Sequence, residues 1–449
     1  MKRAPNSRRG FTLVELMVSL VAGLIVTIAV VGLARAATTT FFEAARISSV
    51  ESTVRSASER LRQDLSRAGY MSTGNIKLAT DQAGGIPLAH RIAVINPTSP
   101  GPNGGSRYTT LNDLQGVHIV VGGSGANAGS FDILNAGTAG PFGMSAKNGL
   151  NPDAIVLGGN YTTDDSYKGT LYDTGGTCSG GRKIVLDAAS DAAVRRLTNT
   201  AVPLASLRAA FQPVPPRRFG ARVVDGRGCQ HYVVVCAVAI TGSGAEISIE
   251  QDAVAGPAVL PAGQTTCGAG KDESVTINPV NRVRWFVGPN TNPALDPAAD
   301  VEAPGSKFNL YRDFLDAESP PAPVNELRQI VAEFAVDLKF GIAVADSTNA
   351  LQIFEMDTDP GGGPIATWTQ DASLTSAGGP APQRVRSVRF RIATRAAVAD
   401  RRNNLVVGPP PYLTRYCTEN APLATCTKFS RVRTVVSEVA LLNQMGMTY

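Results

Sequence analysis

The sequence is poor in the residues from which most active sites and metal sites are built. Its 449 residues include only three histidines (His90, His118 and His231) and six cysteines with no CxxC spacing. A multi-ligand zinc site or a Cys–His nucleophile pair is therefore not expected. The sequence also contains no P-loop, GxSxG or HExxH pattern. We expect no catalytic residue, no cofactor and no metal site, and we do not predict an enzyme.

Charge is also scarce outside one short segment. Charged residues make up 18% of the chain, and the net charge is +5. Lys2, Arg3, Arg8 and Arg9 lie among the first ten residues without an acid, which leaves the rest of the chain almost neutral. Nucleic-acid-binding domains carry their positive charge on a folded face. Nucleic acid is therefore not an expected partner.

An apolar segment follows the basic residues. Residues 16–34 carry no charge, and about 20 apolar residues suffice for a helix to cross a bilayer. A secretory signal peptide has a shorter apolar region and then a small-residue cleavage site, whereas here the helical pattern continues. We predict a retained transmembrane helix over residues 11–37. The basic leader places its N-terminal end in the cytoplasm by the positive-inside rule.

Glu15 lies one turn inside this apolar helix. A carboxylate in a membrane span costs a few kcal/mol, so it indicates a functional site by default. The alternative is a carboxylate near the membrane boundary that reaches the headgroups. Charge alone leaves both interpretations open.

From residue 38 to residue 70 the pattern becomes amphipathic and predicts that the helix continues onto a folded domain. The apolar positions recur at spacings of three and four: Ile47, Val50, Val54, Ala57, Leu61, Leu65 and Ala68. The acid–base pairs Glu51–Arg55 and Arg60–Asp64 are expected on the solvated side. Gly69 is expected to end the helix.

The remaining residues predict short strands between turns rich in proline and glycine. The expected strands cover residues 115–121, 154–157, 183–186, 232–241, 246–250, 282–287, 308–312, 336–345, 385–393 and 432–441. Arg384, Arg386, Arg389 and Arg391 alternate with apolar residues and are expected to face water. One long helix before many antiparallel strands predicts an α+β fold. We expect two β-rich globular regions, 71–290 and 291–449, because proline, asparagine, aspartate and alanine cluster near residues 288–305.

Residues 8–16, which read RRGFTLVEL, resemble the class III leader and N-methylation motif of type IV pilins and pseudopilins. The resemblance implies that residues 1–10 form a leader peptide, that prepilin peptidase cuts between Gly10 and Phe11, and that Phe11 is then methylated. It also implies that Glu15 meets the N-terminal amine of a neighbouring subunit during assembly. Two opposite charges buried together in a helix bundle fit this role.

Weaker similarities point to a subgroup of this family. Residues 59–70, 310–312, 329–341 and 431–443 look like PilW-like minor pilins and J-type pseudopilins, and the large size favours PilW. Many major pilins have a helix-kinking proline where this chain has Gly32. The resemblance implies a pilin-like fold, in which the long helix packs on a large antiparallel β-sheet domain, and a minor pilin that primes type IV pilus assembly.

This assignment implies partners and a location. The expected partners are prepilin peptidase, other minor pilins, the major pilin, a tip adhesin and the inner-membrane assembly platform. The chain would span the inner membrane once, with its C-terminal domain in the periplasm, and then enter the pilus near its tip. The alternatives are a J-type pseudopilin of type II secretion and a membrane-anchored periplasmic enzyme or binding protein.

All six cysteines lie beyond the membrane helix, and an even number in an exported domain predicts disulfides. Cys417 and Cys426 are the best pair because they flank a short loop before the last expected strand, and a C-terminal disulfide loop is familiar in pilins. The pairs Cys229–Cys236 and Cys178–Cys267 follow only by elimination.

Asp357 and Asp359 precede a run of glycines and resemble the start of a calcium loop. The sequence lacks the third carboxylate and the bidentate acid of a full loop. We therefore expect an acidic turn.

Overall fold

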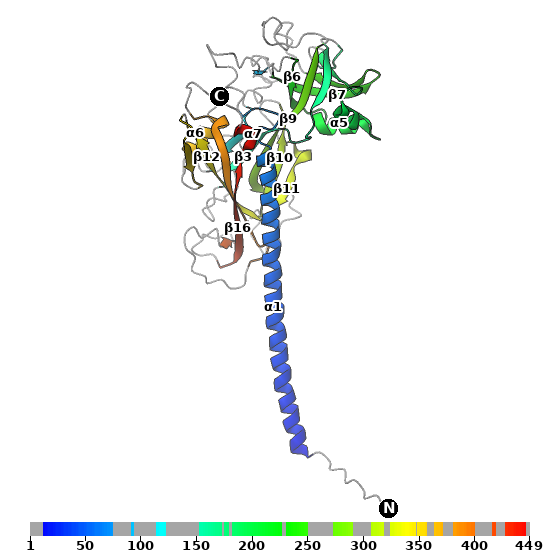
Figure 1. Cartoon of the computed structure of the whole chain (residues 1–449). Helices are drawn as coiled ribbons and strands as arrows, with labels where there is room; N and C mark the ends of the chain where they lie inside the picture. The colour runs from blue at the N-terminus through cyan, green and yellow to red at the C-terminus, as the bar shows by residue number, and fades with distance from the viewer. Residues whose placement is uncertain are drawn as a thin grey trace, which may run out of the picture. The chain divides into compact units, whose positions relative to one another are not determined.

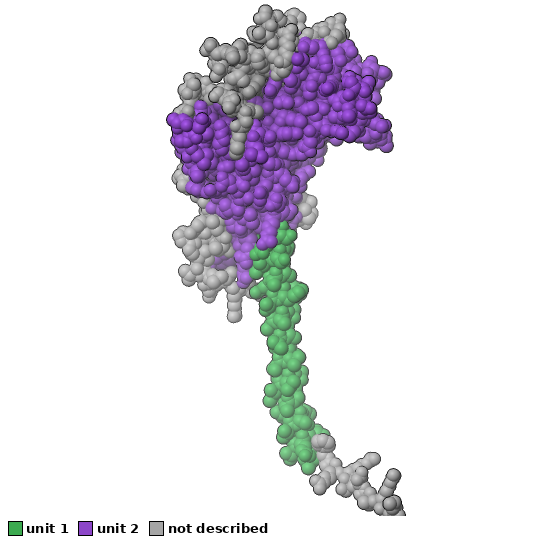
Figure 2. Space-filling view, viewed as in Figure 1, with its two compact units in different colours: residues 1–52 green, residues 53–449 purple. Residues whose placement is uncertain are grey.

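A computed structural model of the chain describes most of the helix and strand framework. The described residues are 12–74, 91–93, 114–122, 152–172, 175–178, 182–226, 230–249, 273–290, 307–317, 324–346, 348–356, 363–370, 380–399, 415–418 and 427–445. The chain forms two compact units, residues 1–52 and residues 53–449 (Figure 2). The expected leader, with Gly10 and Phe11, and the Asp357–Asp359 turn lie outside the described residues.

The first element is the predicted long helix, α1, which covers Leu13–Ser66 (Figure 1). In the first unit its large apolar side chains from Leu13 to Leu33 are all exposed. An exposed apolar surface on every face of a helix is typical of a membrane span. By length and composition α1 is suited to cross a membrane.

The last turns of α1 belong to the second unit and are packed as the sequence predicts. Val54, Ala57, Leu61 and Leu65 are at most 1% exposed, on one stripe of the helix. After Ser66 the hydrogen-bonding pattern changes to that of a tighter turn, because the Arg67 and Ala68 amides donate to carbonyls three residues back. Gly69 then adopts a φ of +75°, a left-handed conformation that glycine adopts without strain. Gly69 is expected from the sequence to end the helix; α1 ends at Ser66, and Gly69 lies in the turn that follows it.

The second unit contains two sheets. The first has 11 strands: β1 (Arg91–Ala93), β2 (Val117–Val120), β3 (Ala154–Gly159), β4 (Tyr167–Tyr172), β5 (Arg182–Leu186), β6 (Phe219–Val224), β7 (Gln230–Thr241), β8 (Gly244–Ile249), β9 (Ser274–Pro289), β10 (Phe308–Leu315) and β11 (Gln329–Ala332). The second has five: β12 (Ala335–Ala345), β13 (Leu351–Phe354), β14 (Val385–Arg395), β15 (Arg415–Cys417) and β16 (Phe429–Ala440). Short helical elements are α4 (Ala192–Thr198), α5 (Pro203–Phe211), η5 (Asn325–Leu327), α6 (Pro364–Gln370), η6 (Pro382–Arg384) and α7 (Leu442–Met445).

Pairing within the sheets is antiparallel, except that β1 runs parallel to β7. The main path of the first sheet is β1-β7-β8-β5-β4-β9-β10-β11, and that of the second is β13-β12-β14-β16-β15. Every strand expected from the sequence overlaps a strand of the structure. The short strands β1, β4, β6, β11, β13 and β15 were not expected. The described part of the chain is thus an α+β structure with a long apolar helix and large antiparallel sheets.

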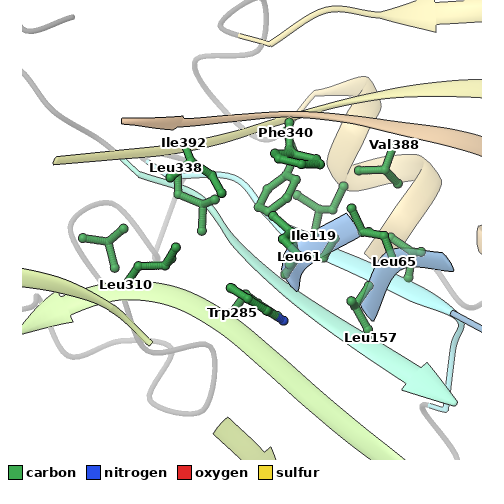
Figure 3. Packing of buried hydrophobic residues seen from close by; sticks show 14 of the residues in the cluster. Leu61, Leu65, Ile119, Leu157, Trp285, Leu310, Leu338, Phe340, Val388 and Ile392 are labelled. Carbon is green, nitrogen blue, oxygen red and sulfur yellow. The ribbon is translucent and has the colours of Figure 1, made fainter. Parts of the chain in front are cut away.

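The main hydrophobic core lies where the end of α1 meets strands of both sheets. Figure 3 shows Leu61 and Leu65 of α1 among Trp285, Phe340 and Val388, and all of these side chains belong to one buried cluster. A separate cluster joins α4 and α5 to β4–β9 of the first sheet. Removal of apolar area from water at about 25 cal/mol per Å² makes the α1 stripe a major contributor to the stability of the second unit.

The two globular regions expected from the sequence are not separate. The predicted boundary at residues 290/291 falls between β9 and β10, which pair along all of Phe308–Leu315. Residues 53–449 form one compact unit. The cluster of proline and asparagine therefore marks a connection between neighbouring strands.

The prediction that the β14 arginines face water is right for Arg389 and wrong for Arg391. Arg389 is partly exposed and lies between Glu355 and Glu438. Arg391 is 7% exposed, and its Nε donates to Asp337 at 2.7 Å. Burial raises the pKa of Asp337 to about 6, although the charge of Arg391 lowers it. Arg389 and Arg391 lie on the same face of β14, because side chains two residues apart in a strand share a face. Alternation assigns both arginines to that face but does not show how far along the strand it is covered.

The structure corrects two of the expected disulfides. Cys178 is bonded to Cys236, with a Cα–Cα distance of 6.3 Å. The pairs Cys178–Cys267 and Cys229–Cys236 are therefore wrong. Cys417 is also disulfide-bonded. Its predicted partner Cys426 lies outside the described residues, as do Cys229 and Cys267, so the Cys417–Cys426 bond stays a prediction.

The sheet topology explains this pairing. Cys178 lies just before β5, and Cys236 lies on β7, and both strands pair with β8. The ladder between β7 and β8 shifts register between Val235 and Ala237, so Cys236 lies at a β-bulge. On the other side, the amide of Thr177 donates to Ser248 of β8 at 3.2 Å. Cys178 and Cys236 therefore both lie next to the same strand, β8, with which β5 and β7 both pair.

We expect non-reducing peptide mapping to recover a peptide pair joined by Cys178 and Cys236. The bond closes a loop with a sequence separation of 58, so Cys178→Ser should lower the free energy of unfolding by about 4 kcal/mol on the chain-entropy model. The double variant Cys178→Ser/Cys236→Ser should lose no more than either single variant, because all three remove the same bond. Recovery of a Cys178–Cys267 or Cys229–Cys236 peptide pair would contradict this prediction.

Candidate functional site

Glu15, the residue expected to act in assembly, participates in the N-terminal cap of α1. The backbone amide and the hydroxyl of Thr12 both donate to Glu15 Oε2 at 3.0 Å. In return, the amide of Glu15 donates to Thr12 Oγ1 at 3.2 Å. This reciprocal arrangement is a capping box, which satisfies amides that have no partner inside the helix. Glu15 therefore has a local structural role in addition to the roles expected from its charge.

A sequence signal for this cap was present. Residues 12–15 read TLVE and precede an apolar run, which is the Ser/Thr-x-x-Glu pattern of a capping box. The cost of the charge and the distance to the headgroups, on which the expectations for Glu15 rest, do not reveal this cap. A negative side chain in the first turn is also favourable, because it lies at the positive end of the helix dipole.

The side chains around Glu15 form the surface that a second helix packed here would contact. Leu13, Leu16 and Met17 are 57–76% exposed, so the carboxylate lies on an otherwise apolar surface. A helix packed on this surface would bury the carboxylate. A buried carboxylate is strongly unfavourable unless a cation or several hydrogen-bond donors face it. The site can therefore accept a cationic group from a packing partner.

The other end of α1 carries a second carboxylate, Asp64, which is buried. Trp285 Nε1 of β9 donates to Asp64 Oδ2 at 2.8 Å. The Arg312 guanidinium of β10 donates to both carboxylate oxygens, at 2.6 and 3.2 Å. Trp285 and Arg312 are direct cross-strand partners, so Asp64 holds α1 to one position of the β9–β10 ladder.

Further contacts complete this anchor. The hydroxyl of Tyr161 donates to the backbone carbonyl of Asp64 at 3.2 Å. Burial raises the pKa of Tyr161 well above its ordinary value, and the Asp64 charge adds to this shift. The Arg312 guanidinium also lies 4.8 Å from the centre of the Phe314 ring. Asp64 is thus surrounded by donors and aromatic rings.

The expectation that Asp64 faces solvent is wrong. Asp64 is 7% exposed, and its partner is Arg312 instead of the expected Arg60. Arg60 contacts Gln329 of β11. The spacing of Arg60 and Asp64 permits an ion pair along the helix, but only the folded sheet shows that a buried arginine lies closer. An acid in the last turn also opposes the helix dipole, which should have marked Asp64 as unusual.

In the part of the chain that the structure describes, two hollows lie beside α5. One is an apolar groove of about 700 Å³, lined by Val202, Leu204, Arg208 and Leu327 among others. The other is a notch of about 300 Å³, in which Arg196 pairs with Asp165 and the Thr163 hydroxyl bonds Tyr167. These polar groups already bond one another. Within the described ranges, no three His, Cys, Asp or Glu residues are grouped to hold a metal ion.

Asp64→Asn is expected to lower the free energy of unfolding by about 3–5 kcal/mol, because it leaves the Arg312 charge buried without its partner. The matched control is Glu59→Gln on the exposed side of the same helix, which should change it by about 0.5 kcal/mol or less. Denaturant unfolding of the detergent-solubilised chain, followed by tryptophan fluorescence, measures both. Replacing both partners, in Asp64→Asn/Arg312→Met, should recover part of the loss. Equal effects of Asp64→Asn and Glu59→Gln would contradict the anchor.

Comparison with known proteins bears on the N-terminal end of α1. A family model for the prokaryotic N-terminal methylation motif matches residues 5–31, which include Gly10, Phe11 and Glu15. No curated protein and no solved structure matches the chain. The matched segment supports a class III leader like that of type IV pilins and pseudopilins. With the apolar helix that follows, it supports membrane anchoring, association with a pilus and interaction with prepilin peptidase and other pilus components.

Proposed function

We propose that this protein is a minor pilin of a type IV pilus, PilW-like, which inserts α1 among the helices of other subunits to prime pilus assembly. The observation that carries this proposal is the continuity of α1 from the methylation motif into the folded core. The motif covers residues 5–31, and the same helix ends in buried residues such as Leu61 and Leu65. A removable signal sequence would not supply part of the core of the domain that it exports.

In this proposal Glu15 changes partners during assembly. In the free chain its carboxylate caps α1 through Thr12. Cleavage after Gly10 creates a free amine at Phe11, and in the filament the amine of one subunit faces Glu15 of its neighbour. Opposite charges that are buried together avoid the large cost of burying either one alone.

The proposed role is structural and includes no catalytic step. The chain spans the inner membrane once with its N-terminus in the cytoplasm and its C-terminal domain in the periplasm, and it later enters the pilus near the tip. Its partners are other minor pilins, the major pilin, a tip adhesin and the assembly platform. The large size of the chain supports this role over that of a J-type pseudopilin.

Processing is the first test. Intact-mass analysis of the membrane-extracted protein should show a chain that begins at Phe11 and carries one methyl group, because the motif places the cleavage after Gly10. Deletion of prepilin peptidase in the same strain should leave the mass of the uncut chain. A mature chain that begins beyond residue 30 would contradict the proposal, because it would mean removal by ordinary signal peptidase.

The second test separates the charge of Glu15 from its capping role. Gln at the third helical position can still complete a capping box, so Glu15→Gln keeps the cap and removes the charge. If a neighbour's amine needs this carboxylate, Glu15→Gln leaves that amine buried and unpaired, at a cost of about 3–5 kcal/mol. Strains that express Glu15→Gln should therefore make far fewer surface pili at normal levels of processed protein.

The matched control is Glu43→Gln, on the same helix beyond the uncharged segment. It should leave piliation unchanged. If α1 is only an anchor for a periplasmic enzyme or binding protein, Glu15→Gln should behave like Glu43→Gln. Normal piliation with Glu15→Gln would therefore contradict the assembly role of this carboxylate.

A further inference from the structure

Met71 lies in the turn that follows α1 and has an unusual backbone conformation. Its φ is +49°, in the left-handed region that residues other than glycine seldom adopt. Such a conformation persists only where the surrounding structure holds it. The side chain of Met71 is partly exposed, and its sulfur faces polar residues of the first sheet. The turn therefore holds a thioether at a fixed place between solvent and the sheet.

Three hydrogen-bond donors are directed at this sulfur. Asn278 Nδ2 of β9 lies 3.4 Å from it, and Asn160 Nδ2, in the residue after β3, lies 3.7 Å from it. The hydroxyl of Ser166, just before β4, lies 3.9 Å away. Both asparagine side chains are fully buried. A thioether is a weak acceptor, so two buried amides donate to a partner that binds them poorly.

The orientation of both amides is determined by their other partners. Asn160 Oδ1 accepts from the backbone amides of Thr162 and Thr163, at 3.3 and 3.2 Å. Asn278 Oδ1 accepts from Arg222 Nη2 at 3.1 Å. Because both oxygens bind donors, the NH₂ groups are the ends that face the sulfur. The two amides thus offer hydrogen atoms to this place, which suits an acceptor stronger than a thioether.

We propose that Met71 is a site of oxidation to methionine sulfoxide, and that the amides of Asn160 and Asn278 bind the sulfoxide oxygen. The oxidant is a peroxide such as hydrogen peroxide. A lone pair of the sulfur attacks one peroxide oxygen, and the sulfur–oxygen bond forms as the oxygen–oxygen bond breaks. The second oxygen leaves as water with both protons of the peroxide. The sulfur loses two electrons and the peroxide gains them, and a polar sulfoxide replaces the thioether.

The second unit is suited to this chemistry. It contains the Cys178–Cys236 disulfide, and disulfides persist in oxidising compartments. The partly exposed side chain of Met71 is open to a small oxidant. Met356, after β13, is partly exposed as well, but among the described residues no hydrogen-bond donor faces its sulfur. The two methionines therefore differ in the groups that can bind a sulfoxide.

Oxidation of Met71 should strengthen the junction between α1 and the first sheet. A sulfoxide usually places a polar oxygen among apolar side chains and disrupts their packing. At Met71 the oxygen instead faces oriented donors on β9 and directly after β3. The backbone of Asn160 already joins this turn, because its amide donates to the Tyr70 carbonyl at 3.0 Å. The oxidised side chain adds stronger hydrogen bonds at the same junction.

The test compares the reduced and the peroxide-treated forms of the detergent-solubilised full chain. Peptide mass spectrometry measures the oxidation of Met71 and Met356, and urea unfolding followed by tryptophan fluorescence measures stability. Treatment should lower the equilibrium constant for unfolding about tenfold, because two buried donors gain a stronger acceptor. The Met71→Leu chain reports on the other methionines, and its treatment should give no such gain.

A second variant tests the donors. Asn278→Asp has the same shape and keeps an acceptor for Arg222, but an oxygen replaces the NH₂ group that faces the sulfur. Treatment should therefore not stabilise it. The matched control is Asn281→Asp, at a buried asparagine of the same strand that bonds the Tyr161 amide instead, and it should keep the gain. Each comparison is made within one chain, so the baseline stability of a variant cancels.

Three outcomes would overturn the proposal. One is that Met71 stays reduced while Met356 is oxidised. The second is that treatment changes the stability of the unaltered chain and of Met71→Leu equally. The third is that Asn278→Asp gains as much as the unaltered chain. If Asn278→Asp does not fold, the comparison with Met71→Leu still decides. The proposed pilin function does not depend on this result, because the Glu15 experiment tests it separately.

Discussion

The buried carboxylate of Asp64 is the interaction on which the folded unit of this protein depends most directly. Asp64 receives hydrogen bonds from Trp285 and Arg312, which are cross-strand partners on β9 and β10. Around it, Leu61 and Leu65 pack in the core that both sheets share. Apolar packing supplies the stabilisation but is non-directional, whereas the geometry of the ion pair permits a single register of α1 against the sheet.

Each end of α1 carries a carboxylate, and the two differ in how the helix dipole acts on them and in where their partners lie. Asp64 lies in the last turn, where the helix dipole disfavours an acid, and its partners come from the sheet. Glu15 lies in the first turn, where the dipole favours an acid, and its partner is Thr12 of the same helix. The first carboxylate is already paired within the chain, and the second lies on an exposed apolar surface that another helix can cover. One carboxylate of the helix therefore holds it to the sheet, and the other caps its first turn.

Sheet topology accounts for the features of the second unit that depend on distant parts of the chain. The shared neighbour β8 brings Cys178 and Cys236 together, although other cysteines are closer to each along the sequence. Arg391 is buried and bonds Asp337 of the neighbouring strand β12, whereas Arg389, on the same face of β14, is only partly buried. The same topology leaves β13 at an edge with Leu351 and Ile353 exposed. Each feature is a consequence of strand order.

The sequence by itself determined the features that depend on local pattern. The length of the apolar segment, the buried stripe through Leu61 and Leu65, and the turn at Gly69 all follow from helical periodicity and backbone preference, which act over a few residues. Only the tertiary structure decided the partner of Asp64, the burial of Arg391 and the Cys178–Cys236 bond. Periodicity shows that a side chain faces a given side of its element. Which distant residue the side chain contacts depends on strand order and register. One short segment of sequence does not contain that information.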